Sequence, residues 1–566
     1  MSRPTALDER DPIQRTRKLR VGLLVDGTDS NKYVYDLARW AAGQDDLDFS
    51  HLLIVRRPVQ DFAQGLAGMP NKGIYQRLSE VFFKLLVKFE QILIKRNPLH
   101  GDHLATFHLD QIIGKQVEIT PILSRSGFVY RFSSKDIEAV RGLHLDLLIR
   151  CGSGILFGEI LDAARLGVLS FPHADNRVNR GGPAGFWEAF YRSDETGFTL
   201  QKLTEEPDGG VVLKRGAFTT QFFWLLNQAH LYKKSNEHLK DLLKSIAASG
   251  NLPRSEEFVP NSARLYKAPQ LHQTLVYACK IFWRIALKVG KRAVSLKERW
   301  SVSFIHTGWQ NAVFRRAKRI PNPPGRFLAD PFLHVRDGRT YCFVEDYVYR
   351  TGRGHISVYE LRANDAVEIG PCLIEPFHLS FPYLFEYQDH LYMCPETATA
   401  QQIRVYRSTE FPQKWDLAAV LMADIRAADT MLFEHEGKWW MLTNIDKSEI
   451  GDHCAELYLF HAESPLSDQW TAHPLNPLYI DPRVARNAGL FMDNGRLFRA
   501  AQRQSFDAYG AGFAIFEIIT LSETDYVEQR VATIEPNFKR RLRGTHHIST
   551  TGSTTAIDHL SISFVR

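Results

Sequence analysis

The segment Ala329–Asp346, ADPFLHVRDGRTYCFVED, indicates the fold of the C-terminal half because its pattern recurs along the chain. Each copy has an alternating apolar run, a turn and a second apolar run, which is the pattern of a β-hairpin. The turn residues are Gly338, Asp389, Gly437, Gly495 and, in a less regular fifth copy, Gly552. Several short strands per repeat, at a spacing of roughly 50 residues, are typical of a β-propeller. We therefore predict an all-β, five-bladed β-propeller over residues 300–566.

The repeat also predicts a binding site, because equivalent positions of successive blades converge on the axis of a propeller. Two positions of the repeat, one before and one after each turn, carry mostly carboxylates and amides, and the last copy adds histidines. The predicted substrate-binding residues are Asp330, Glu345, Glu396, Asp429, Asn444, Asn487, Gln502 and His546. Such donors and acceptors suit a hydroxyl-rich ligand such as a carbohydrate. The alternative is that Asp330 and Asp429 only tie down blade turns through hydrogen bonds.

Length and composition set the limits for the rest of the chain. A chain of 566 residues is too long for one core, so we expect two or three domains. The six cysteines are scattered without a Cys-x-x-Cys pair, which argues against a disulfide framework or a zinc site, and we predict no metal. The charged N-terminus lacks the apolar core of a signal peptide, and no run is long and apolar enough to span a bilayer. We therefore expect a cytoplasmic protein.

The N-terminal part alternates apolar strands with helices. Arg20–Val25 and Ser50–Val55 have the composition of buried strands, and Asn31–Ala42 is predicted to be the helix between them. This alternation predicts a Rossmann-like α/β domain over residues 19–250, with a parallel sheet that helices cover on both faces. Glycines after the strand ends could bring the backbone close to a ligand, although no G-x-G-x-x-G or Walker pattern is present.

The segments LDLLIRCGSGIL and RLGVLSFPHADNRVNRGGPAGFWEAFYRSDETGF, within Leu145–Gly216, resemble the core of formyltransferases that act on methionyl-tRNA or amino sugars. In that family an Asn, a His and an Asp polarise the formyl group and move protons. The match places Ser170 at the Asn position, Pro172 at the His position with His173 next to it, and Asp208 at the Asp position. The resemblance implies catalytic roles for Ser170, His173 and Asp208, and 10-formyltetrahydrofolate as the donor. Because two positions depart from the family pattern, another transfer reaction or an inactive domain stays open.

A second resemblance covers about 240 residues of the C-terminal half. Segments such as GRFLADPFLHVRDGRTYCFVEDYVYRTGRGHISVYE and NPLYIDPRVARNAG resemble the propeller domain named for glucosamine inositolphosphorylceramide transferase. The half is more distantly similar to arabinanase-like glycosidases, in which the Asp of an Ala-Asp-Pro segment is the base. That resemblance implies Asp330 as the base and Glu396 as the acid, since glycoside hydrolysis needs paired carboxylates.

Between the two parts, residues 251–299 form a predicted basic, helical connector. The amphipathic stretch 271–294 carries Lys280, Arg284, Lys288 and Lys291 among apolar residues. A basic amphipathic helix of this kind can lie on an anionic membrane surface. Alternatively, it packs between the domains and exposes its basic face to water. No nucleic-acid-binding module accompanies the charge, so we expect no nucleic acid partner.

Three functions remain open from the sequence. The first is a formyltransferase-like, carbohydrate-active transferase that modifies a nucleotide-sugar or a lipid-linked glycan in surface polysaccharide synthesis. The second is a glycan-binding or scaffold protein whose N-terminal domain is inactive. The third is a propeller glycosidase. All three predict a carbohydrate ligand at the propeller axis.

Overall fold

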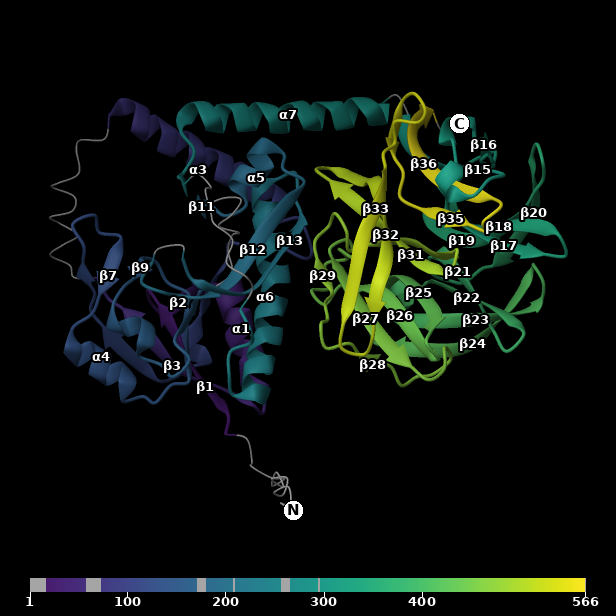
Figure 1. The fold of residues 1–566 in the computed structure, drawn as a ribbon. Helices are drawn as coiled ribbons and strands as arrows, with labels where there is room; N and C mark the ends of the chain where they lie inside the picture. The colour runs from purple at the N-terminus through teal and green to yellow at the C-terminus, as the bar shows by residue number, and fades with distance from the viewer. Residues whose placement is uncertain are drawn as a thin grey trace, which may run out of the picture.

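The protein consists of an α/β domain and a β-propeller that stand side by side (Figure 1). The structure is a computed structural model, and it describes residues 17–57, 73–170, 180–206, 209–255, 265–293 and 296–564. Helix α7 (Leu271–Ala293) leads from the first part to the second. Each part has hydrophobic clusters of its own, and the cluster of the α/β domain also includes Ala455 of the propeller, so the two parts pack directly on each other.

The α/β domain is built on a seven-stranded sheet with the order β13-β12-β10-β8-β1-β3-β5. The five strands from β10 to β5 pair in parallel, and β12 and β13 add an antiparallel hairpin at one edge. The strands are β1 (Leu19–Val25), β3 (Leu47–Val55), β5 (Gln116–Ile119), β8 (Leu147–Arg150), β10 (Val168–Ser170), β12 (Glu195–Lys202) and β13 (Val211–Thr219). The central strands are apolar on both faces, which is why the sequence shows continuous apolar runs there.

Helices cover both faces of this sheet, as the alternation predicts. Helices α1 (Lys32–Ala42) and α6 (Trp224–Ser249) pack on one face, and α4 (Ser134–Arg141) packs on the other. Asn31 begins α1, because its side chain accepts hydrogen bonds from the first free backbone amides of the helix. The short elements are β2 (Asp29–Asn31), β4 (Thr106–His108), β6 (Ile122–Leu123), β7 (Val129–Arg131), β9 (Ile155–Leu156), β11 (Arg180–Gly181), α5 (Phe186–Tyr191) and β14 (Leu265–Tyr266).

Helix α7 packs on the α/β domain together with α3 (Ile74–Ile94). Their inner faces form an aromatic cluster with α5 and the start of α6. At its centre, Glu90 of α3 accepts a hydrogen bond from the Tyr277 hydroxyl (2.8 Å) and one from the backbone amide of Leu225 (2.7 Å). Burial raises the pKa of Glu90 to about 7. The inner face of the predicted connector is therefore a packing face.

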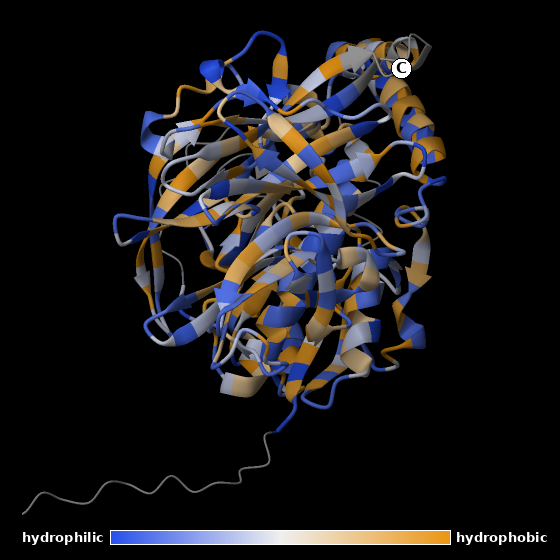
Figure 2. Ribbon diagram, turned by 90° about the vertical axis from the view of Figure 1, so that its right-hand side faces the viewer, coloured by the Kyte–Doolittle hydropathy of each residue, from blue (hydrophilic) through white to orange (hydrophobic). Residues whose placement is uncertain are grey.

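The propeller has five blades among the described residues, and the first four follow one another along the chain. The first four blades contain strands β17 to β20, β21 to β24, β25 to β29 and β30 to β33. Their bounds are β17 (Arg326–Arg336), β18 (Arg339–Val348), β19 (Arg353–Leu361), β20 (Ala366–Leu373), β21 (Ser380–Tyr387), β22 (His390–Glu396), β23 (Gln402–Glu410), β24 (Lys414–Ala423), β25 (Ala427–His435), β26 (Lys438–Ile445), β27 (Glu456–Ala462), β28 (Thr471–Ala472), β29 (Tyr479–Ile480), β30 (Asn487–Asp493), β31 (Arg496–Ser505), β32 (Ala508–Leu521) and β33 (Tyr526–Ile534). Apolar and polar residues alternate along these strands (Figure 2). The predicted five-bladed propeller is confirmed.

The predicted hairpins are the inner two strands of each blade. In the first blade both turn residues, Asp337 and Gly338, have positive φ, and the same holds for the equivalent pairs of the next three blades. Positive φ at both positions defines the type I′ turn, which matches the twist of the flanking strands and favours Asn, Asp and Gly. This preference is the physical reason that the repeat is visible in the sequence.

The fifth blade joins the two ends of the propeller. Strand β15 (Leu296–Ile305) comes before the first blade and pairs antiparallel with the last strand, β36 (Thr555–Phe564). The blade is completed by β16 (Lys318–Arg319), β34 (Leu542–Gly544) and β35 (Ile548–Thr550), and Gly552 lies in the turn between β35 and β36. Val302 and Phe304 of β15 are fully buried in the seam with the first blade. This pairing removes the free edge strands that an open propeller would expose.

Candidate functional site

Three blades carry the same backbone distortion at the start of their inner strands. Asp330, Phe381 and Asp429 have φ values of 48°, 47° and 50°, and each lies at a β-bulge in the ladder to the neighbouring strand. A non-glycine residue in this left-handed region costs about 1–2 kcal/mol. Bulges redirect side chains, and here they turn two carboxylates toward residues of other blades. The candidate site at the propeller axis is built on these bulges.

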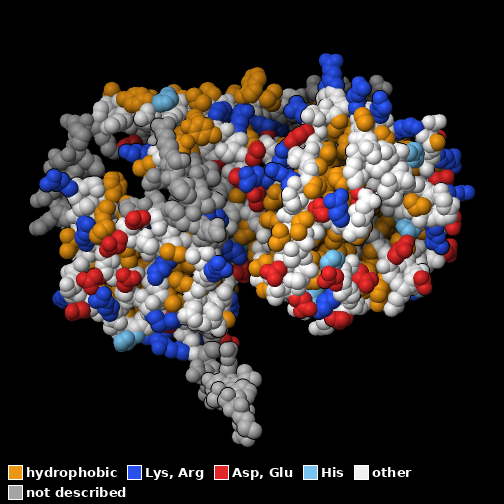
Figure 3. All heavy atoms as spheres, viewed as in Figure 1, with side chains coloured by type: hydrophobic (Ala, Val, Ile, Leu, Met, Phe, Trp, Pro, Cys, Tyr) orange, Lys and Arg blue, Asp and Glu red, His pale blue; other side chains and the backbone are white. Residues whose placement is uncertain are grey.

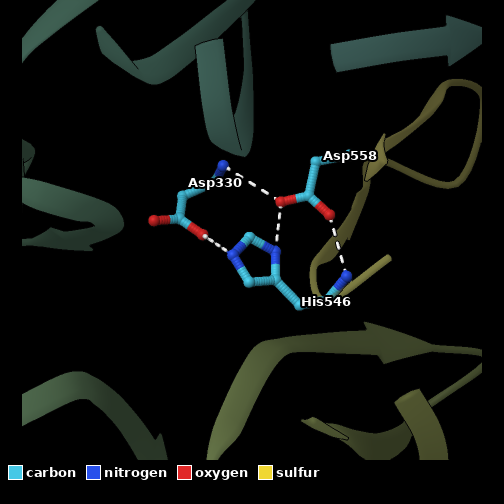
Figure 4. Close-up of side chains that lie close together, drawn as sticks. All are labelled: Asp330, His546 and Asp558. Carbon is cyan, nitrogen blue, oxygen red and sulfur yellow. Dashed lines mark hydrogen bonds and ion pairs between the residues drawn. The ribbon is translucent and has the colours of Figure 1, made fainter. Parts of the chain in front are cut away.

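Asp330 contacts a buried His–Asp pair of the fifth blade (Figure 4). Nδ1 of His546 bonds to Oδ2 of Asp558, and Nε2 of His546 lies 3.7 Å from Oδ1 of Asp330. Asp558 also accepts hydrogen bonds from the backbone amides of His546 (2.9 Å), His547 (3.1 Å) and Asp330 (3.3 Å). Asp558 therefore holds both the imidazole and the bulge that carries Asp330.

The electrostatics of this group leave Asp330 ready to exchange a proton near neutral pH. Burial raises the pKa of Asp330 to about 7, although the His546 imidazole opposes that rise. Burial would lower the pKa of His546, but the Asp558 carboxylate holds it above its ordinary value. Burial would likewise raise the pKa of Asp558, and the same imidazole keeps it low. Asp558 is thus the fixed anion of the group, and Asp330 is the group that titrates.

A second buried cluster brings together blades two, three and four. The guanidinium of Arg486 lies 2.6 Å from Oδ2 of Asp429 and 3.4 Å from Oε2 of Glu396. Burial raises the pKa of Asp429 to about 6 and also raises that of Glu396, and the Arg486 charge limits both increases. One cation thus holds two carboxyl groups that would otherwise repel each other.

Glu345 is the carboxyl group whose ionisation the site disfavours most clearly. Burial raises its pKa well above the ordinary value, and the carboxylates of Asp330 and Glu396 raise it further. His378 faces it, with Nε2 3.6 Å from Oε1 of Glu345. Nδ1 of His378 accepts a hydrogen bond from the backbone amide of Gly354 (2.8 Å), so the proton of the neutral ring is on Nε2 and points at Glu345. Burial and the neighbouring carboxylates therefore both oppose the ionisation of Glu345, as the direction of its pKa shows.

The three predicted amides form hydrogen bonds within the propeller, and their role in substrate binding stays a prediction. Asn444, Asn487 and Gln502 are buried, and their side chains bond to other parts of the propeller. Asn444 donates to the carbonyls of Glu456 and Ala485, at 2.9 Å each. Asn487 donates to the carbonyls of Asp429 and Leu442, and Gln502 donates to Asp429 and Asn487. These amides tie neighbouring blades together, because each satisfies backbone groups that would otherwise be buried without partners.

Aromatic side chains border the axial carboxylates. The indole of Trp300 stacks on His546 with ring centroids 3.9 Å apart, and Tyr509 meets both rings edge-on. Arg486 lies over the Tyr509 ring at 5.3 Å. Tyr509 is exposed. Gly510 has a φ of 62°, and a Cβ at this position would lie 2.7 Å from the His546 side chain. An exposed aromatic ring next to buried carboxylates is a suitable stacking surface for a sugar ring.

The α/β domain packs on the propeller edge from which the inner strands begin, which is also the edge of the candidate site. Lys234 of α6 is buried against three propeller carboxylates, with Nζ 2.8 Å from Glu456, 3.5 Å from Asp452 and 3.7 Å from Asp446. Arg486 lies at the same edge, and its Nη1 is 3.8 Å from Sγ of Cys454. The candidate site and the domain interface therefore share one group of loops.

The predicted N-terminal site is only partly visible. Ser170 is buried at the end of β10, whereas His173 and Asp208 lie outside the described residues. At the same edge of the sheet, the Asp26 carboxylate accepts hydrogen bonds from the backbone amide (3.0 Å) and the hydroxyl (3.0 Å) of Ser153. The roles of Ser170, His173 and Asp208 stay predictions.

We expected no metal, yet the described residues include one group whose spacing would accommodate a cation. Asp330, His546 and Asp558 each have a ligand atom within 4.8 Å of the others. Two carboxylates and an imidazole are suitable ligands for a divalent metal. His546 is already bonded to both carboxylates, so a metal would have to replace these contacts.

Two central residues escaped the sequence analysis. Asp558 lies on the closing strand, where a single acidic residue interrupts the apolar pattern of TTAIDHLSISF, and that interruption is the signal that could have identified it. Arg486 directly precedes Asn487, one of the positions of the repeat. Each residue acts through a partner on another blade, which the repeat pattern does not contain.

Comparison with known proteins relates the C-terminal part to one family. The family described as "Glucosamine inositolphosphorylceramide transferase 1, N-terminal" matches residues 283–549. A curated relative with the name glucosamine inositolphosphorylceramide transferase 1 from Oryza sativa subsp. japonica is 34% identical over 210 residues, which cover 36% of this chain and 28% of the relative. The Arabidopsis thaliana protein of the same name is 33% identical over 213 residues, covering 37% and 28%. The resemblance predicted for the propeller half is confirmed. The chain spans little more than a quarter of these relatives.

Solved structures with a similar arrangement of strands include glycoside hydrolases. The catalytic domain of the Coprinopsis cinerea GH62 α-L-arabinofuranosidase has a TM-score of 0.32 and 13% identity, covering 45% of this chain and 84% of that one. A thermostable family-43 glycoside hydrolase has a TM-score of 0.28 and 14% identity, covering 37% and 76%. The family match begins at residue 283, so the resemblance of the N-terminal domain to formyltransferases stays a prediction.

Proposed function

We propose that this protein acts on a carbohydrate at the axis of its propeller. The observation that carries the proposal is the convergence of Asp330, Glu345, Glu396 and Asp429 with His546 and Arg486, in surroundings that raise the pKa of all four carboxyl groups. Acid–base chemistry at a glycosidic bond requires paired carboxyl groups, and a raised pKa lets one of them act as the proton donor. The relatives named as glucosamine inositolphosphorylceramide transferases support a sugar as the group that is bound.

Within this proposal, the two best placed groups have opposite roles. Asp330 is the base, because its pKa of about 7 makes a substantial fraction ionised at neutral pH and His546 stabilises the carboxylate. Glu345 is the acid, because burial and the neighbouring carboxylates raise its pKa and favour its protonated form. It would donate its proton to the leaving oxygen while Asp330 takes the proton of the attacking hydroxyl or water. Glu396, the acid expected from the arabinanase resemblance, lies beside the Arg486 cation and is less suited to donate a proton. The proposed reaction is transfer of a glycosyl group to a hydroxyl acceptor or to water.

The experiment is a screen of the full-length protein against activated aryl glycosides and nucleotide-sugars, followed by the variants Asp330→Asn and Glu345→Gln. We expect turnover of at least one compound, and a loss of about 10²–10⁴-fold in kcat for each variant. The control is Asp416→Asn on an outer strand, which should keep full activity. Saturation-transfer NMR on the same panel separates the alternative function. A glycan-binding scaffold would bind a compound without turning it over. In that case neither the wild type nor Asp330→Asn would show turnover.

We also propose, as a separate activity, the formyl transfer that the N-terminal resemblance implies. Its support is the position of Ser170 at the carboxyl end of a parallel strand, where ligands of open α/β sheets bind. The test is calorimetric titration of the protein with 10-formyltetrahydrofolate or a stable folate analogue. His173→Ala and Asp208→Ala should remove formylation of an amino-sugar nucleotide and leave the melting temperature unchanged. Absence of folate binding would reject this activity and would not affect the proposal for the propeller.

A further inference from the structure

Helices α3 and α7 expose an apolar surface that their packing does not explain. Their inner faces already fill the aromatic cluster with α5 and α6. Their outer faces nevertheless carry large apolar side chains, and Ile74, Trp283 and Phe282 are 80%, 65% and 78% exposed. Orange side chains gather along the top of the molecule, over these two helices (Figure 3). We call this surface the α3–α7 face.

The apolar residues of α3 form a continuous stripe. The exposed members are Ile74, Tyr75, Leu78, Val81, Phe82, Leu85, Phe89 and Ile92. These positions recur at intervals of three, four and seven residues, which places them on one side of a helix. The buried members, such as Leu86 and Ile94, occupy the opposite side. The outer stripe is exposed to solvent. On a typical surface helix this side would be polar, but on α3 it is apolar.

The described side chains on the outer face of α7 continue the stripe and carry no charge. Its exposed apolar residues are Leu275, Val276, Phe282, Trp283, Leu287 and Val289. Two of the lysines and arginines predicted for a membrane contact point away from this face. Lys280 donates a hydrogen bond to the backbone carbonyl of Phe190 (2.5 Å), and Arg284 forms an ion pair with Asp507 of the propeller. These two cations therefore contact other parts of the protein, and the predicted membrane contact of the helix stays a prediction.

Basic residues lie beside the apolar stripes. On α3 and its C-terminal end they are Arg77, Lys84, Lys88, Lys95 and Arg96. The acidic residues of the two helices are Glu80 and the buried Glu90, so the charge next to the face is strongly positive. A second copy of the chain would bring the same cations against themselves, which disfavours a symmetric dimer at this face. The positive border instead complements a negatively charged surface.

We infer that the α3–α7 face docks on the surface of an anionic lipid bilayer. Phenyl, phenol and indole rings next to lysine and arginine are the residues that prefer the boundary between lipid headgroups and acyl chains. Among the described residues, none of the helices has the length and hydropathy needed to cross a bilayer. The two helices would therefore lie in the plane of the membrane, with the apolar stripe inserted and the lysines at headgroup level.

This docking would also place the propeller beside the membrane. Helix α7 continues into the closing blade, and its Arg284 holds the β31–β32 hairpin through Asp507. The same hairpin carries Tyr509, which borders the axial carboxylates. The inference does not rest on the proposed carbohydrate chemistry, since it depends only on the outer faces of α3 and α7.

The test measures binding of the full-length protein to vesicles by flotation. Vesicles of phosphatidylcholine alone are compared with vesicles that also contain phosphatidylserine, each at low and high salt. We expect binding to the anionic vesicles that weakens at high salt, because ions screen the lysines. The double variant Phe82→Ser/Trp283→Ser should lose most of this binding. A matched control, Ile374→Ser/Ile519→Ser, removes side chains that are 68% and 54% exposed away from the face and should bind as the wild type does.

A second variant separates charge from apolar contact. Lys84→Gln/Lys88→Gln should reduce partition to anionic vesicles by about fivefold per lysine and reduce its salt dependence. It also decides the question if the Phe82/Trp283 variant fails to fold, as judged from its melting temperature. The inference would be overturned if the wild-type protein did not bind anionic vesicles, or if the variants bound as well as the wild type. A dimer in sedimentation that Phe82→Ser/Trp283→Ser dissociates, without vesicle binding, would assign the face to a second copy.

Discussion

Arg486 lies 2.6 Å from Asp429, and this contact holds the centre of the propeller together. The pair joins the fourth blade to the third, and the same guanidinium reaches Glu396 of the second at 3.4 Å. All three side chains are largely withdrawn from water. Because a buried charge without a partner is costly, the arginine and the two carboxylates depend on one another.

Replacing Arg486 should therefore destabilise the protein more than the loss of one contact suggests. We expect Arg486→Met to lower the free energy of unfolding by about 3–5 kcal/mol, because it leaves two buried carboxyl groups without a cation. Arg486→Lys should recover part of the loss, since it restores the charge but not the forked geometry. Urea denaturation measures both. As a control, Arg483→Gln removes a half-exposed arginine nearby and should cost less than about 1 kcal/mol.

The contribution of Asp330 and Asp429 to stability should fall as the pH rises from about 4 to about 7. The pKa of Asp330 is about 7 in the folded protein and that of Asp429 about 6, so the folded state binds protons more tightly than the unfolded chain, in which both groups ionise near pH 4. Their stabilising effect is present below the unfolded pKa and is lost as the pH rises through the folded pKa. Asp330→Asn should reduce this slope and raise stability at pH 8 by about 1–3 kcal/mol. Denaturation midpoints across this pH range provide the measurement, and an unchanged slope in the variant would contradict the prediction.

Asp452 and Glu456 should contribute to the pH dependence with the opposite sign, at lower pH. Burial opposes ionisation of Asp452 and Glu456, but Lys234 outweighs it and holds the pKa of each at about 2. These groups stabilise the fold above their unfolded pKa and lose that effect as the pH falls through the folded one. Lys234→Met should remove this protection and cost about 3–5 kcal/mol, because three carboxylates lose their cation. Calorimetry should then show two transitions, one for each domain. Lys447→Gln, which breaks an exposed pair with Asp241, is the matched control.

Removing β15 should disrupt the propeller. Truncated proteins that begin at Ser295 and at Gly325 differ by the strand that pairs with β36 along its whole length. We expect the shorter protein to be insoluble or to melt far below the longer one, because it exposes the edge of β36 and the seam of the first blade. The blade also contains Asp558, so the shorter protein should lose the support of His546 and Asp330. Equal melting temperatures would contradict this role of β15.

The repeat made the propeller predictable, down to the pairing of its ends. Type I′ turns favour Asn, Asp or Gly, and half-buried inner strands alternate apolar with polar residues. Gly338 and its equivalents therefore identify the blades from the sequence alone. The strand-like segments Trp300–His306 and His559–Arg566 would each lack a partner, so the sequence predicts that they pair, and β15 does pair with β36. Local propensity and the cost of an open edge are both visible in the sequence.

The predictions for the site were less complete, because burial and charge balance depend on distant residues. Asp330, Glu345, Glu396 and Asp429 do meet, as the repeat register implied. The register could not show that the side chains of Asn444, Asn487 and Gln502 form hydrogen bonds to backbone carbonyls of the propeller. It also could not show Arg486 as the shared cation.

The sequence by itself determined the blades, the parallel sheet and the amphipathic character of α7, since each depends on a period along the chain. Only the tertiary structure decided which side of α7 faces the protein, since Glu90 and Phe190 belong to other elements and take Tyr277 and Lys280 as partners. It alone placed Asp558 behind His546, and Lys234 among three propeller carboxylates. These contacts join residues far apart in the chain, and their energies come from desolvation and pairing, which no local pattern encodes.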